Sequence, residues 1–110
     1  MPNKEVKEKF LFVSQPMEKK TMEEFQEVAR DAQAEIEAET GEKIILLDSW
    51  IYGNAGDRSK NPPVYYLGRS LEIMAEADYV AFVGNWKGAR GCLIERDVAD
   101  SYDVERIFEF

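Results

Sequence analysis

Residues 10–17 of the chain read Phe-Leu-Phe-Val-Ser-Gln-Pro-Met. Four consecutive apolar residues that favour strands, followed by polar and turn-forming residues, indicate a strand buried on both faces of a parallel sheet. Residues 44–47, Ile-Ile-Leu-Leu, and residues 79–83, Tyr-Val-Ala-Phe-Val, have the same character. Residues 104–110 alternate more and predict a weaker edge strand. The sequence therefore predicts four strands.

A helical pattern lies between each pair of strands. Thr21 and Glu24 form a capping-box sequence that opens the first helix, and Gly41 is placed to end it. Its apolar stripe is Met22, Phe25, Val28, Ala29, Ala32 and Ile36. Asn61 and Pro62 start the second helix, with a core stripe of Val64, Leu67, Leu71 and Met74. The third helix is predicted over residues 90–102.

Alternation of buried-type strands and helices predicts a parallel sheet with helices on both faces, because each parallel return needs a right-handed crossover. We expect one α/β domain over residues 1–110, a three-layer α/β/α sandwich of flavodoxin-like or Rossmann-like type with strand order 2-1-3-4. Residues 49–60 have no clear period, and a connection of this length is typical of a functional lid or a disordered loop.

Composition excludes several classes of function. The 110 residues hold 14 Lys plus Arg, 22 Asp plus Glu, one Cys and no His, for a formal net charge of −8. Without His there is no Ser-His-Asp triad, and Cys92 alone cannot make an internal disulfide or a structural zinc site, so we expect no metal and no cofactor. The acidic balance argues against duplex nucleic acid as a partner. The lack of a long apolar run argues against a membrane partner and a cleavable signal, and a reducing, cytoplasmic location fits best.

Ligands of open parallel sheets bind beyond the carboxyl ends of the strands. This rule selects three loops, which we expect to converge on one cleft. The candidate binding residues are Ser14, Gln15, Pro16 and Met17 after the first strand, Asp48 with Ser49 and Trp50 after the second, and Asn85, Trp86, Gly88, Arg90 and Gly91 after the third.

Several of these residues have two interpretations. Gly88 and Gly91 before a helix could cradle a phosphate or form a tight strand-to-helix turn. Trp50 and Trp86 could stack on a base or sugar, or cover the sheet edge. Asp48 could hold a ribose hydroxyl or cap the next turn. The sequence leaves these alternatives open, whereas for Cys92 a buried small residue is favoured over a catalytic thiol.

Glu95 is the most informative residue. Its spacing to Val98, Ala99 and Tyr102 places it on the predicted apolar stripe, which also includes Ile94. A carboxylate on the core side of a first helical turn is either a partly buried ion pair, here with Arg90 or Arg69, or a nucleophile or general base.

Residues 11–17 (LFVSQPM), 76–86 (EADYVAFVGNW) and 89–99 (ARGCLIERDVA) resemble a family of small bacterial and phage domains related to the nucleoside 2-deoxyribosyltransferases. The resemblance covers almost the whole chain, and the Ser-Gln-Pro-Met and Arg-Gly-Cys-x-x-Glu elements are its most specific parts. It implies a flavodoxin-like fold and cleavage or exchange of N-glycosidic bonds of nucleosides or nucleotides. It also implies that Glu95 attacks the sugar C1′.

The chain departs from that family at two positions. Ser70 stands where the enzymes have an aspartate that assists base protonation, and Phe10 stands where they commonly have a tyrosine. The main hypothesis is a nucleoside- or nucleotide-binding protein that cleaves or transfers at the N-glycosidic bond with Glu95 as nucleophile. The alternatives are a non-catalytic binder or sequesterer of a nucleotide or nucleotide-derived signal, and an interaction domain with an empty cleft. Relatives complete their sites across subunits, so we expect a homo-oligomer.

Overall fold

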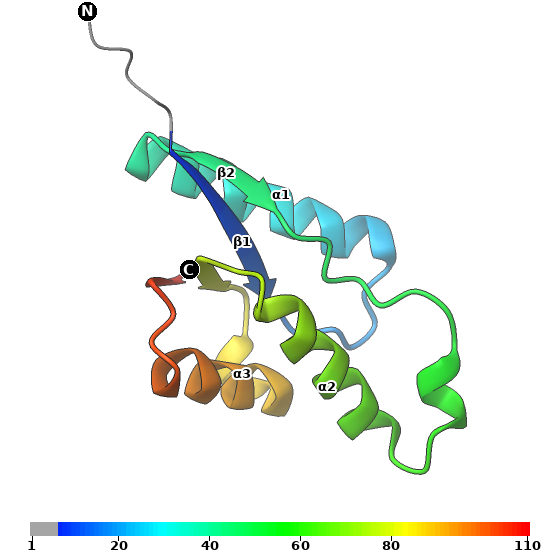
Figure 1. Cartoon of the computed structure of the whole chain (residues 1–110). Coiled ribbons are helices and arrows are strands. Elements are labelled where there is room, and N and C mark those ends of the chain that lie inside the picture. The colour runs from blue at the N-terminus through cyan, green and yellow to red at the C-terminus, as the bar shows by residue number, and fades with distance from the viewer. Residues whose placement is uncertain (1–6) are drawn as a thin grey trace, which may run out of the picture.

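The computed structural model describes residues 7–110 and contains one four-stranded parallel sheet (Figure 1). Its strands are β1 (Glu8–Ser14), β2 (Lys43–Leu46), β3 (Tyr79–Phe82) and β4 (Arg106–Glu109). Their order is β2-β1-β3-β4, as predicted. Leu11 of β1 pairs with Leu46 on one side and with Tyr79 on the other. The sheet thus has β1 and β3 at its centre and two edge strands.

Three helices complete the α/β/α sandwich. Helix α1 (Met22–Thr40) begins with the predicted capping box, and Gly41 ends it with the left-handed φ of 71°. Helix α2 (Pro62–Met74) begins after Asn61, whose side chain accepts a hydrogen bond from the Val64 amide. Helix α3 is Arg90–Ser101. Figure 1 shows α1 on one side of the sheet and α2 and α3 on the other.

Alternating residues of the strands form a core on each face of the sheet. Leu11 and Val13 of β1 point toward α1, where they pack with Ala29, Ala32 and Ile36. Phe12 points to the opposite face, and the members of that second core are Met74, Val80, Phe82, Trp86, Cys92 and Ala99. Because Ser14 follows Phe12 by two residues, its side chain lies on the α2–α3 face.

Four predicted core residues are exposed. Phe10, at the outer end of β1, is 41% exposed, and Val64, in the first turn of α2, is 61% exposed, whereas Leu67, one turn later, is half-buried. On α3, Ile94 and Tyr102 are 37% and 80% exposed. The buried residues of α3 are Cys92, Glu95 and Ala99. The buried face therefore shares Glu95 and Ala99 with the predicted stripe, but it includes Cys92 in place of Ile94 and Tyr102.

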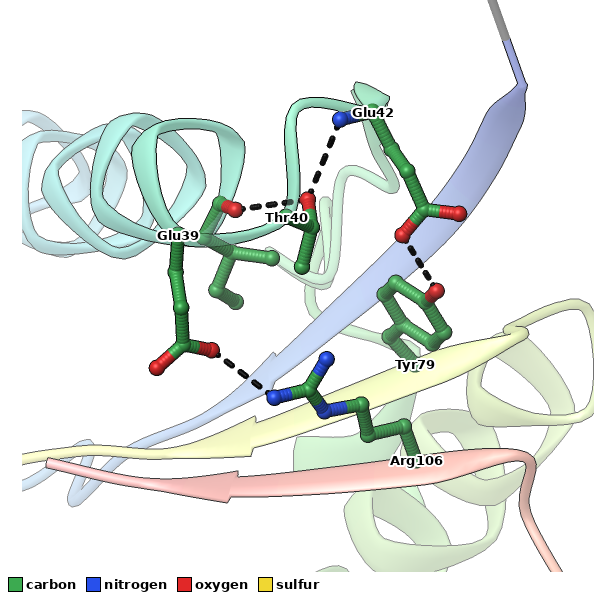
Figure 2. Close-up of polar contacts among 6 residues, drawn as sticks. Glu39, Thr40, Glu42, Tyr79 and Arg106 are labelled. Carbon is green, nitrogen blue, oxygen red and sulfur yellow. Dashed lines mark hydrogen bonds and ion pairs between the residues drawn. The ribbon is translucent and has the colours of Figure 1, made fainter.

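Charged side chains cover the part of the sheet beyond α1 (Figure 2). The Arg106 guanidinium lies 4.4 Å from the centre of the Phe108 ring and pairs with Glu39 at 2.9 Å. The Tyr79 hydroxyl donates a hydrogen bond to Glu42, and burial is the main cause that raises the pKa of Tyr79 to about 12. The Arg106 and Glu42 contacts thus lie on Phe108 and Tyr79, both of which are buried.

Within residues 7–110, no helix has the length and apolar character needed to cross a membrane.

Candidate functional site

A cavity of about 490 Å³ lies at the carboxyl ends of the central strands. Its lining comes from the end of β1 and the turn after it, the segment after β2, the N-terminal parts of α2 and α3, and Phe25 of α1. This is the end of the sheet at which the parallel topology predicts a ligand site. The residues predicted for binding or catalysis that line it are Ser14, Gln15, Pro16, Met17, Ser70, Gly91 and Glu95, together with Ser49 and Trp50.

The Glu95 carboxyl is buried in this cavity. The residue is 7% exposed, and its Oε1 accepts a hydrogen bond of 2.7 Å from Ser14 Oγ at the end of β1. Burial raises the pKa of Glu95 to about 7, although the Ser14 hydrogen bond acts in the opposite direction. Near neutral pH, such a carboxyl is present both as an ionised nucleophile or base and as a protonated acid.

Neither predicted ion pair of Glu95 is formed in the described chain. Arg90 is exposed at the start of α3, and Arg69 pairs with Glu72 at 2.9 Å on the surface of α2. In residues 7–110, Ser14 is the hydrogen-bond partner of the Glu95 side chain. No Arg or Lys side chain of the described residues therefore forms an ion pair with the Glu95 carboxylate.

Gln15 fixes the turn after β1. Its Nε2 donates to the Phe25 carbonyl at 3.0 Å, and its Oε1 accepts a hydrogen bond of 2.6 Å from Lys20 Nζ. Both polar ends of Gln15 are occupied, so it serves to hold the loop on α1. Burial lowers the pKa of Lys20. No periodicity or motif in the sequence marks Lys20 as the partner of Gln15.

Cys92 faces the same cavity three residues before Glu95. The residue is 4% exposed, as expected for a buried small residue, and burial raises the pKa of its thiol, while the nearby Ser14 hydroxyl lowers it. A neutral thiol is a poor nucleophile, which argues for a packing role.

The segment between β2 and α2 forms one wall of the cavity. Trp50 packs edge-on against Phe25 of α1 with ring centroids 5.4 Å apart. The other end of the segment contains a short 3₁₀ helix, η1 (Ala55–Arg58), where Asp57 accepts a hydrogen bond of 2.9 Å from the Tyr66 hydroxyl of α2. Gly56 lies against Tyr66 so closely that no side chain fits there. The segment thus joins α1 to α2.

Sequence reasoning missed part of this lining as binding residues. The additional lining residues are Phe12, Val13, Phe25, Ile51, Gly53, Pro63, Tyr66, Leu67, Ala89 and Cys92. Phe25 and Leu67 belong to the apolar stripes predicted for the first and second helices, and near the N-terminal ends of α1 and α2 these stripes reach the cavity. Their periodic spacing alone does not distinguish a core side chain from one that lines a cavity.

Five predicted binding residues lie outside the lining. Asp48 caps the next turn by accepting from the Trp50 amide at 3.1 Å, and it also accepts from the Tyr52 hydroxyl. Trp86 is 7% exposed because the short 3₁₀ helix η2 (Trp86–Gly88) turns its ring onto Phe82, 5.1 Å away. The other three, Asn85, Gly88 and Arg90, are exposed.

Gly88 belongs to a tight turn between β3 and α3. Of the two interpretations given above for this glycine, a phosphate cradle or a tight turn, the structure contains the turn. Its amide donates to the Asn85 carbonyl at 3.1 Å, and a Cβ on Gly88 would lie 2.9 Å from Asn85 Nδ2. Trp50 remains at the cavity, as does Gly91 at the start of α3.

No group of three or more acidic or Cys side chains within residues 7–110 is arranged to hold a metal ion. Comparison of the chain with protein-family models, with curated proteins and with solved structures gives no match.

Proposed function

We propose that the cavity binds a nucleoside or nucleotide and that Glu95 attacks C1′ of its sugar, so that the N-glycosidic bond is cleaved or the sugar is transferred. The observation that carries this proposal is the buried Glu95 carboxyl, which lines a cavity of about 490 Å³ next to Ser14. Small-molecule sites typically measure about 300–1,000 Å³ and are mostly apolar with a few placed polar groups.

The lining suits the two parts of a nucleoside. Trp50, Phe25 and Tyr66 provide aromatic surface for a planar base. The side chains of Ser14, Ser70 and Glu95 provide hydroxyl and carboxyl groups for the sugar. The resemblance to the nucleoside 2-deoxyribosyltransferases supports the same assignment for Glu95.

The proposed reaction has two steps. A carboxylate oxygen of Glu95 forms a bond to C1′, and the bond from C1′ to the base nitrogen breaks with its electron pair going to the base. The base takes a proton from water, which reaches the cavity past exposed lining residues such as Met17 and Gly53. Water, or a second base, then attacks C1′, the bond to Glu95 breaks, and the proton of the attacking group goes to solvent.

A non-catalytic binder is the second candidate. One observation favours it: Glu95 is the single carboxylate among the cavity-lining residues of the described chain, and Ser70 stands where the resemblance implies an acid for base protonation. The same cavity would then hold a nucleotide or nucleotide-derived signal intact.

Base release measured by chromatography distinguishes the two. The panel is deoxynucleosides, their 5′-monophosphates and NAD, with the native protein, Glu95→Gln and the matched control Asp97→Asn, an exposed carboxylate on the same helix. We expect release by the native protein and by Asp97→Asn, and a loss of about 1,000-fold or more in Glu95→Gln.

A large thermal shift with intact recovery of the ligand would support the binder. Absence of both release and thermal shift over the whole panel would contradict both candidates.

Two further predictions belong to this proposal. A homo-oligomer is expected, and sedimentation that shows only monomer at micromolar concentration would contradict it. The single Cys predicts a reducing, cytoplasmic setting.

A further inference from the structure

Ser14 contacts the carboxyl on which the proposed reaction depends. Its side chain is 2% exposed at the last position of β1, and its Oγ donates to Glu95 Oε1 at 2.7 Å. A hydroxyl has one proton to donate, and Ser14 gives it to Glu95. The central strand therefore fixes one of the two carboxyl oxygens.

The other carboxyl oxygen is left for the ligand. Within residues 7–110, Glu95 Oε2 has no hydrogen-bond partner. Every fully enclosed side-chain nitrogen or oxygen atom in these residues has such a partner, so Oε2 is not fully enclosed. Oε2 is thus accessible from the cavity that Glu95 lines. The two oxygens of one carboxyl have different surroundings.

We propose that Ser14 is a positioning residue, which holds Oε1 so that Oε2 is the oxygen of Glu95 presented to the sugar C1′. This inference rests on the proposed function. When Oε2 bonds to C1′, Oε1 becomes the carbonyl oxygen of the glycosyl ester and keeps the Ser14 hydrogen bond. When the ester bond breaks in the second step, the negative charge returns to a carboxyl that Ser14 stabilises.

Other titratable groups at or near the cavity do not take this role. Cys92 on α3 and Tyr66 on α2 line the cavity, and Lys20 lies outside its lining, in the turn before α1. In the described chain none of the three forms a hydrogen bond or ion pair with Glu95. Lys20 instead donates to Gln15, and Tyr66 donates to Asp57. Ser14 is thus the group whose removal changes the Glu95 carboxyl directly.

The test is the titration of the Glu95 carboxyl carbon, followed by nuclear magnetic resonance and assigned by the signal lost in Glu95→Gln. The variants are Ser14→Ala, the conservative Ser14→Thr, and the control Ser49→Ala. Ser49 is buried and lines the same cavity, but its hydroxyl forms no hydrogen bond with Glu95. Ser14→Ala is expected to raise the pKa of Glu95 by about half a unit to one unit, since a hydrogen bond to the charged form is lost. Ser14→Thr is expected to restore it, and Ser49→Ala to leave it unchanged.

Kinetics give the second readout. In Ser14→Ala, kcat for base release should fall about 10-fold or more, the acid limb of the pH profile should move to higher pH with the titration, and KM should change little. An unchanged Glu95 titration in a folded Ser14→Ala protein would overturn the inference, as would an equal shift in Ser49→Ala.

If Ser14→Ala does not fold, Ser14→Cys takes its place. Cys retains a weak donor, so the pKa of Glu95 should shift less and in the same direction, and the absence of any shift would overturn the inference. No base release by the native protein would contradict the proposed reaction, whereas the titration still tests the Ser14 contact.

Discussion

Gly56, in the segment after β2, lies directly against the ring of Tyr66 on α2. A Cβ at Gly56 would overlap that ring and would lie 2.7 Å from Cδ1 of Tyr65. Two aromatic side chains thus limit residue 56 to glycine, and the wall of the cavity is fastened to α2 by packing as well as by the Asp57–Tyr66 hydrogen bond.

Gly56→Ala is therefore expected to destabilise the protein by about 1–3 kcal/mol, because an atom is forced into an occupied space. Gly68→Ala is the matched control, since it lies within α2 with nothing within 4 Å of its Cβ position. That change should stabilise the protein by about 0.5–1 kcal/mol because alanine favours helix. Urea unfolding measures both, and equal effects of the two substitutions would show that Gly56 does not pack as described.

Glu95→Gln is expected to make the protein more stable at alkaline pH. The pKa of Glu95 is raised in the folded state from 4.5 to about 7, so between these values the folded protein holds the proton more tightly than the unfolded chain. Stability then falls as pH rises through this range, by about 3 kcal/mol in total. The uncharged Gln avoids this loss and still accepts a hydrogen bond from Ser14.

Urea unfolding at pH 5 and pH 8 measures the effect. The advantage of Glu95→Gln over the native protein should be large at pH 8 and small at pH 5. Asp97→Asn should show no such difference, because Asp97 is exposed. An advantage that does not change with pH would mean that the carboxyl is not buried in its charged form.

Arg106→Ala is expected to destabilise the sheet on its α1 face by about 1–2 kcal/mol. The substitution removes the ion pair with Glu39, which Figure 2 shows, and also the guanidinium over the Phe108 ring. Arg30→Ala is the control, because Arg30 is exposed on α1 and forms no ion pair with another described residue. Thermal unfolding measures both, and a loss of stability in Arg30→Ala equal to that in Arg106→Ala would contradict a specific covering role.

The sequence predicts the architecture well and the site in part. Buried strands have short apolar runs that end in turn residues, so the positions of Ser14 and Glu95 at one end of the sheet follow from topology. The inward direction of Glu95 was predicted correctly, although Tyr102, used to define the same stripe, is 80% exposed. A helix near its end can leave an apolar residue in solvent, and periodicity cannot show where packing stops.

Trp86 shows what sequence cannot decide. Its loop position predicted either stacking on a ligand or hydrophobic cover, and only the three-residue turn of η2 settles that the ring packs on Phe82. The irregular segment after β2 was expected to be a lid or a disordered loop. The structure places part of it in the wall of the cavity and holds its other end on α2 through Gly56 and Asp57, and neither of these contacts has a recognisable sequence signature.

Cys92 offers a direct test of where a ligand binds. It is the single cysteine of the chain, so each thiol label reports on this residue alone. Its thiol is buried at the cavity and burial raises its pKa, so a thiol reagent such as 5,5′-dithiobis(2-nitrobenzoate) should react at least about 10-fold more slowly with the native protein than with the urea-unfolded chain at the same pH. A nucleoside or nucleotide that fills the cavity should slow the native reaction further, in proportion to occupancy. Equal native and unfolded rates would contradict the burial of Cys92, and a saturating ligand without effect on the rate would place its binding site elsewhere.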